Sequence, residues 1–306
     1  MGKKDLWQSD YFDDKRRFAD MINGVMFHGE QIIREEELEE LDSQLVHHEK
    51  NEEAIKVIRD KVYRWKGQKI SICILENQSY VDYRMVLRVM LEEAVGYLKQ
   101  QKHSYRKWIN ARYKFTKNEF LSQMRKNEKF QPIITLILYL GKNEAWDGAR
   151  SLYELLEMDE RLQPFVTNYR LNLFDYHDYK DFSQFKTENR FIFELLLNSK
   201  DENKMNEIIS VYMNGYLLDK ESMRAIFGVL GINININKYK VKTEEGERFD
   251  MCKAWNDHKE SGRQEGRQEA IKENLENLMK SMNLTLEKAM EALMIPEEDR
   301  VLYHID

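Results

Sequence analysis

The sequence has few of the residues that mark a disulfide-bonded, zinc-binding or membrane-spanning protein. Its only cysteines, Cys73 and Cys252, are far apart in the chain and fit neither a zinc-ligand spacing nor a disulfide framework. No apolar run approaches the roughly 18–20 residues that a membrane-spanning helix needs, and the first residues lack the apolar stretch of a signal peptide. We therefore expect a cytoplasmic protein with no membrane partner.

Proline is also scarce, with three in 306 residues, whereas leucine, glutamate, lysine and methionine are plentiful, so helix should predominate. Hydrophobic residues make up 42% and charged residues 33%, a balance typical of a folded globular chain rather than a disordered one. The net charge of −6 is unfavourable for a protein coated with nucleic acid, because phosphate contacts dominate such binding. A local basic surface remains compatible with that charge.

One stretch is strongly basic. Residues 102–129 contain nine Lys or Arg and two Glu, with aromatic residues between them. Basic and aromatic side chains together are typical of a nucleic-acid contact surface, although a solvated helical insertion has the same composition. The candidate DNA contacts are Arg106, Lys107, Arg112, Lys114 and Lys117.

The first half of the chain has the periodicity of an α/β fold. Residues 14–28 and 83–101 repeat apolar side chains at helical spacing. Residues 57–65 and 69–78 have the β-branched and aromatic content of two strands, and residues 132–141 form an apolar run typical of an interior strand. The order helix, two strands, helix, strand predicts a mixed sheet flanked by helices.

The rest of the chain predicts mainly helix. Composition changes near residue 250, where a repeated Gly-Arg-Gln-Glu leads into a charged helical tail, and Thr285 is placed to cap a later helix. We therefore expect a core at 1–145, a mainly helical extension at 146–249 and a charged helical tail at 250–306. The tail is a candidate surface for homo-oligomer formation.

The end of the strand at 69–78 carries the residues of greatest chemical interest. Ile72, Ile74, Glu76 and Gln78 share one face by the period of two, so an apolar stripe ends in two polar groups. Asp60 lies on the preceding strand. Two carboxylates on neighbouring strands are a suitable ligand set for Mg²⁺ or Mn²⁺, which activates water for phosphodiester hydrolysis. The alternative is that both acids are solvated strand ends.

The turn between the two strands decides whether Asp60 can join Glu76. A two-residue turn at 66–67 would pair Asp60 with Cys73 and place it on the opposite face. A three-residue loop at 66–68 would pair it with Ile74 and bring it beside Glu76. We predict that loop, or a bulge. Asp20, on the first helix, is a fourth candidate, with a surface acid as the alternative.

These residues resemble those of a known nuclease family. Asp60 followed by Glu76-Asn77-Gln78 resembles the D…ExQ variant of the PD-(D/E)XK signature. The surrounding blocks at 17–27, 75–90, 132–141 and 146–148, and the tail at 251–254 and 295–300, resemble the Rpn family of recombination-promoting nucleases, which are also described as transposases. The resemblance spans nearly the whole chain.

The resemblance implies a restriction-endonuclease-like core with a four-stranded mixed sheet flanked by helices. It also implies a DNA endonuclease that depends on Mg²⁺, or Mn²⁺, with metal bound by Asp60 and Glu76. Gln78 would orient the attacking water, and Asp20 would add a further acid. Two other functions stay open: a catalytically inactive DNA-binding or protein-interaction remnant of a mobile element, and a helical protein–protein scaffold.

Overall fold

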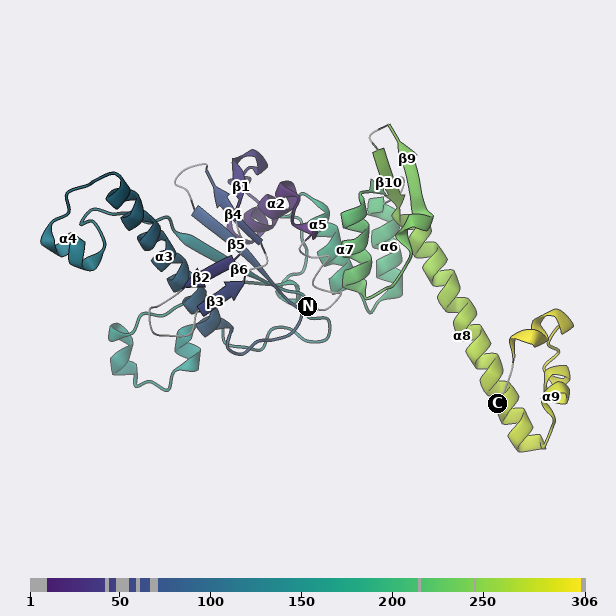
Figure 1. Ribbon diagram of the computed structural model, residues 1–306. Coiled ribbons are helices and arrows are strands. Elements are labelled where there is room, and N and C mark those ends of the chain that lie inside the picture. The colour runs from purple at the N-terminus through teal and green to yellow at the C-terminus, as the bar shows by residue number, and fades with distance from the viewer. Residues whose placement is uncertain are drawn as a thin grey trace. The chain divides into compact units, whose positions relative to one another are not determined.

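A computed structural model describes residues 10–41, 44–47, 55–58, 61–66, 71–213, 216–244 and 246–303 (Figure 1). For residues 44–47, 55–58, 71–77 and 212–213 the description is limited to the backbone. The chain forms two compact units, one made of residues 1–212 and 219–233 and the other of residues 213–218 and 234–306. The candidate site lies in the first unit.

A five-stranded mixed sheet forms the centre of the first unit. Its order is β1 (Leu38–Glu40), β4 (Lys61–Trp65), β5 (Ser71–Gln78), β6 (Ile133–Tyr139) and β7 (Asn172–Asp175). The first three strands pair antiparallel, whereas β5, β6 and β7 are parallel. The α/β class is therefore confirmed, with five described strands in this sheet where four were expected. Strands β2 (Gln44–His47) and β3 (Ile55–Ile58) form a separate two-stranded ribbon.

Helices α2 (Lys15–Met26) and α5 (Glu188–Leu197) cover one face of this sheet. The ring of Phe18 on α2 lies 4.4 Å from that of Tyr63 on β4. The ring of Phe174 on β7 lies 4.6 Å from that of Phe193 on α5. Gly24 lies within α2. A larger residue would not fit there, because the ring of Phe185 occupies the place that a β-carbon would take.

Helix α3 (Met85–Asn110) covers the other face. Met85 and Val89 pack against Ile137 and Tyr139 of β6 and against Trp146. The predicted helix at 83–101 is correct in type but ends too early, because α3 continues through the basic stretch to Asn110. A short helix, α4 (Lys117–Ser122), follows it with Thr116 as its cap.

The remaining elements of the first unit are mostly helical. They are η1 (Glu35–Glu37), η2 (Leu152–Leu155), η3 (Glu160–Phe165), η4 (Tyr176–Asp178), α6 (Glu202–Met213) and α7 (Lys220–Leu230). Strand β7 lies in the segment expected to be a helical extension, yet it completes the sheet. The segment boundaries expected at 145 and 249 rest on composition and stay predictions.

The second unit combines a small sheet with a helical hairpin. Its elements are β8 (Leu217–Leu218), η5 (Ile236–Tyr239), β9 (Lys240–Thr243), β10 (Gly246–Asp250), α8 (Met251–Met282), α9 (Leu286–Ala292) and η6 (Glu297–Leu302). Leu275 of α8 packs against Ala289 and Met290 of α9, and Thr285 caps α9 as predicted. Among the described helices, α8 included, there is no stretch with the length and apolar content to cross a bilayer.

Candidate functional site

The carboxyl ends of the three parallel strands bring polar side chains into one row. Gln78 at the end of β5 is opposite Tyr139 of β6, and Tyr139 is opposite Asp175 of β7. Residues in such a row point to the same face of the sheet. The carboxyl edge of parallel strands is where α/β proteins commonly bind ligands, so we expect a ligand or substrate site along this row.

Glu76 and Gln78 share the face that α3 covers. Glu76 is opposite Ile137, and Ile137 packs against Met85 and Val89 of α3. The side chain of Gln78 is buried, with 6% of the residue exposed. The side chain of Glu76 lies outside the described part of the chain, so its placement rests on the backbone register.

Asp60 lies outside the described residues, but its neighbours establish the register of β4 with β5. Trp65 is opposite Ser71, whereas a three-residue loop at 66–68 would place it opposite Lys69, so the register predicted from that loop is wrong. Lys61, which follows Asp60 in sequence, is opposite Leu75, which precedes Glu76. The two-residue turn is excluded as well. It would pair odd-numbered residues of β4 with even-numbered residues of β5, whereas the structure pairs odd with odd and even with even.

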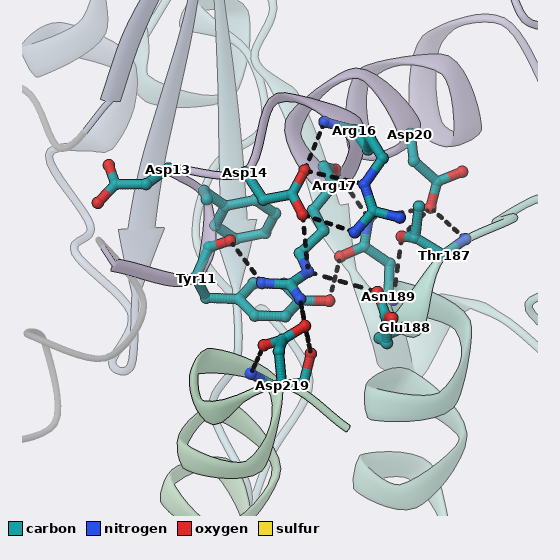
Figure 2. Close-up of polar contacts among 12 residues, drawn as sticks. Tyr11, Asp13, Asp14, Arg16, Arg17, Asp20, Thr187, Glu188, Asn189 and Asp219 are labelled. Atoms are coloured by element: carbon teal, nitrogen blue, oxygen red, sulfur yellow. Dashed lines mark hydrogen bonds and ion pairs between the residues drawn. The ribbon is translucent and has the colours of Figure 1, made fainter. Parts of the chain in front are cut away.

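Asp20 is not the surface acid considered as one alternative, because only 2% of it is exposed. Figure 2 shows its carboxylate against the start of α5. It accepts hydrogen bonds from the Lys186 backbone at 2.7 Å, from the Thr187 backbone at 3.1 Å and hydroxyl at 2.6 Å, and from the Asn189 amide at 3.0 Å. Helix α2 also covers the face opposite to that of Glu76 and Gln78. A metal-binding role for Asp20 would have to replace these four hydrogen bonds.

The described side chains do not by themselves form a metal site. Within the described ranges, no three His, Cys, Asp or Glu side chains are grouped closely enough to hold an ion. Asp175, the described carboxylate in the row, already accepts hydrogen bonds from the backbone of Trp146 and from His177. A metal at this edge would therefore depend on Asp60 and Glu76, whose side chains are outside the description.

The structure adds Asp175 and His177 to the residues that the sequence indicated. His177 Nδ1 lies 2.7 Å from the Asp175 carboxylate, and Asp175 is fully buried. Burial raises the pKa of the neighbouring Tyr139, and the negative charge of Asp175 raises it further. In the sequence, the only indication of this pair is the Asp-x-His spacing at 175–177. That spacing points to a site only once Asp175 is known to end a strand of the sheet.

The basic stretch lies at the opposite end of α3 from this edge. All five candidate DNA contacts are exposed: Arg106, Lys107, Arg112, Lys114 and Lys117. Helix α3 starts at Met85, shortly after β5 ends, and runs for 26 residues to Asn110. At 1.5 Å per residue its ends are about 37 Å apart. Figure 1 shows α4 beyond the far end of α3.

An aromatic cluster supports this basic end, which we call the cap and define as residues 102–130. The Arg125 guanidinium lies 4.0 Å from the Trp108 ring and 4.9 Å from the Tyr113 ring, within the range of cation–π attraction. Trp108 also donates a hydrogen bond to Glu128 at 3.1 Å. The cap is therefore a folded feature with basic side chains at its surface.

Comparison with protein-family models, with curated proteins and with solved structures finds no match for this chain.

Proposed function

We propose that this protein is a metal-dependent DNA endonuclease of PD-(D/E)XK type. The observation that carries the proposal is the position of Glu76 and Gln78 on one face at the carboxyl end of β5, the middle strand of the mixed sheet. The β4–β5 register supports it, since Lys61 and Leu75, the sequence neighbours of Asp60 and Glu76, are opposite each other. The resemblance of the surrounding blocks to the Rpn family agrees with this reaction.

Each residue has a distinct part in the proposed reaction. Asp60 and Glu76 bind Mg²⁺ or Mn²⁺ through their carboxylates. A bound divalent cation supplies water activation and offsets the charge that develops on phosphate. Gln78 orients the attacking water through its amide without adding positive charge. Because the side chain of Gln78 is buried, its amide is held in place by packing.

The cap supplies affinity for the DNA backbone in this proposal. Its exposed Lys and Arg side chains neutralise phosphates, which is a sequence-independent contribution. The separation of about 37 Å along α3 means that one duplex reaches both the cap and the catalytic edge only if it has at least about 11 base pairs. The net charge of −6 makes nucleic-acid contact over the rest of the surface unfavourable.

Plasmid cleavage tests the proposal. Purified protein with Mg²⁺ or Mn²⁺ should nick or linearise supercoiled DNA, and Glu76→Ala and Asp60→Ala should each abolish this. Glu157→Ala is the matched control, because Glu157 is exposed and far along the chain from β5. Cleavage that survives both catalytic substitutions would identify a contaminant or another centre. An inert wild type that still shifts DNA in a salt-dependent way would support the inactive DNA-binding remnant.

A further inference from the structure

The Asp175 carboxylate is held from two sides at the end of β7. Its Oδ2 accepts a hydrogen bond from the Trp146 backbone at 2.6 Å, and its Oδ1 accepts one from the His177 backbone at 3.0 Å. The same Oδ1 lies 2.7 Å from His177 Nδ1. Since Asp175 is fully buried, these contacts hold it in one orientation.

The His177 ring is oriented by this carboxylate and by its aromatic neighbours. It stacks on Tyr176 with ring centroids 4.0 Å apart, and Tyr176 is anchored by a 2.7 Å hydrogen bond from its hydroxyl to the Gly141 carbonyl. The Tyr139 ring lies 6.4 Å away. With Nδ1 engaged by Asp175, Nε2 is the ring atom available to another molecule, and 23% of the side chain is exposed.

This ring lies at the same sheet edge as the proposed catalytic residues. Gln78, Tyr139 and Asp175 form one row, so the backbones of Gln78 and Asp175 are two strand spacings, or about 10 Å, apart. His177 comes two residues after Asp175 and reaches back toward Tyr139. A DNA strand crossing this edge would pass both Gln78 and His177.

We propose that His177, oriented by Asp175, donates a proton to the sugar oxygen that leaves when the phosphodiester bond is cleaved. The inference rests on the nuclease activity proposed above. As the oxygen of water bonds to phosphorus, the bond from phosphorus to the sugar oxygen breaks, and the Nε2 proton moves to that oxygen to form a hydroxyl. The proton lost by the attacking water goes to solvent, and neutral His177 regains a proton from solvent.

The choice of substrate separates proton donation from a structural role. His177→Gln keeps a side chain that can hydrogen-bond to Asp175 but cannot act as an acid. On DNA the sugar oxygen is a poor leaving group, so turnover by the variant should fall by about 100-fold or more. On bis(p-nitrophenyl) phosphate the phenolate leaves without taking a proton, so turnover should change by less than about threefold. His258→Gln, in α8, is the matched control and should leave both rates unchanged.

Three outcomes have distinct meanings. Equal losses on both substrates, or no loss on DNA, would overturn the role of His177 while leaving the nuclease proposal in place. A wild type that turns over neither substrate would contradict the nuclease proposal itself and the proton transfer with it. A selective loss on DNA, with an unchanged melting temperature, would support the proposal.

A measurement without metal or turnover tests the placement of the ring. NMR signals of the ¹⁵N-labelled histidine rings are recorded in EDTA with and without a phosphorothioate DNA duplex. The His177 signal is identified as the one that is absent from the spectrum of His177→Gln. The Nε2 signal of His177 should shift when the duplex binds, whereas that of His258 should not. An unchanged His177 signal under saturating duplex would overturn the proposal, because it would place the ring away from the DNA.

Discussion

The guanidinium of Arg17, on α2 in the first unit, forms an ion pair with Asp219, a residue 202 positions later in the chain. Arg17 also bonds to Glu188 at 3.3 Å and to the Ser222 hydroxyl at 2.8 Å, and it lies over the Tyr11 ring (Figure 2). Only 3% of its side chain is exposed. One buried cation therefore joins the starts of α2, α5 and α7.

Replacing Arg17 should destabilise the first unit. Breaking a fully buried ion pair costs about 3–5 kcal/mol, and the partial exposure of Asp219 and Glu188 reduces the expected loss for Arg17→Met to about 2–4 kcal/mol. Urea unfolding measures it. Arg16→Met is the control, because the Arg16 side chain is 54% exposed and its pair with Asp14 should contribute no more than about 1 kcal/mol. Equal losses for the two variants would contradict a central role for Arg17.

Asp20→Asn should lower stability without lowering cleavage per folded molecule. The new amide group faces backbone and side-chain donors at 186–189, so a loss of about 2–3 kcal/mol is expected in urea unfolding. Cleavage should be retained because Asp20 packs on the opposite face of the sheet from Gln78. Asp178→Asn, at a half-exposed acid, is the control for stability. Loss of cleavage by a folded Asp20→Asn protein would restore Asp20 to the catalytic set.

Asp82 should make stability dependent on acid pH. Burial raises the pKa of Asp82, but hydrogen bonds from the Arg84 side chain and backbone outweigh it, so the pKa is lowered overall. A lowered folded-state pKa contributes stability above the unfolded value near 4, and this contribution is lost as pH falls through the folded value. The difference in unfolding free energy between wild type and Asp82→Asn should therefore shrink from pH 7 to pH 3.

Asp159 provides the control for that pH dependence. It forms an exposed ion pair with Arg161 at 2.6 Å, where water and salt screen the charges. Hydrogen bonds from Arg161 lower the pKa of Asp159 to about 2, so the difference for Asp159→Asn should also shrink from pH 7 to pH 3. Because this pair is exposed, 1 M NaCl should remove that change, whereas the change for Asp82→Asn should persist. A pH-independent difference for Asp82→Asn would mean that Arg84 does not hold the Asp82 charge in the folded protein.

The cap should affect long duplexes more than short ones. Substituting Arg112 and Lys114 by Glu should weaken binding to a duplex of about 30 base pairs and lower the salt slope by about 2. Cleavage of a duplex of about 8 base pairs should not change, because it cannot span the length of α3. Lys204→Glu with Lys220→Glu is the charge-matched control, since both residues are exposed. Equal effects of the cap variant at both lengths would contradict two-site contact.

Several elements could be predicted because their signals are local. Helix α2 and strand β6 follow directly from apolar periodicity and from a continuous apolar run, and Thr285 caps α9 as its position before the helix suggested. Glu76 and Gln78 share a face because alternation is a property of any strand. Strand β7 was missed because four residues, one of them Asn, carry too little pattern to be recognised.

The pairing of these elements depended on contacts that no local pattern contains. The register of β4 with β5 is set by packing on both faces of the sheet, so the loop length could not be read from Gly67. The burial of Asp20 depends on α5, whose first turn lies more than 160 residues away in sequence.

The sequence by itself determined helix α2, strands β5 and β6, and the side-chain alternation that places Glu76 and Gln78 on one face. Only the tertiary structure decided that Asp175 and His177 lie at the same edge as Gln78. That row exists because β5, β6 and β7 pair in parallel, and strand pairing arises from long-range hydrogen bonds and packing rather than from local composition.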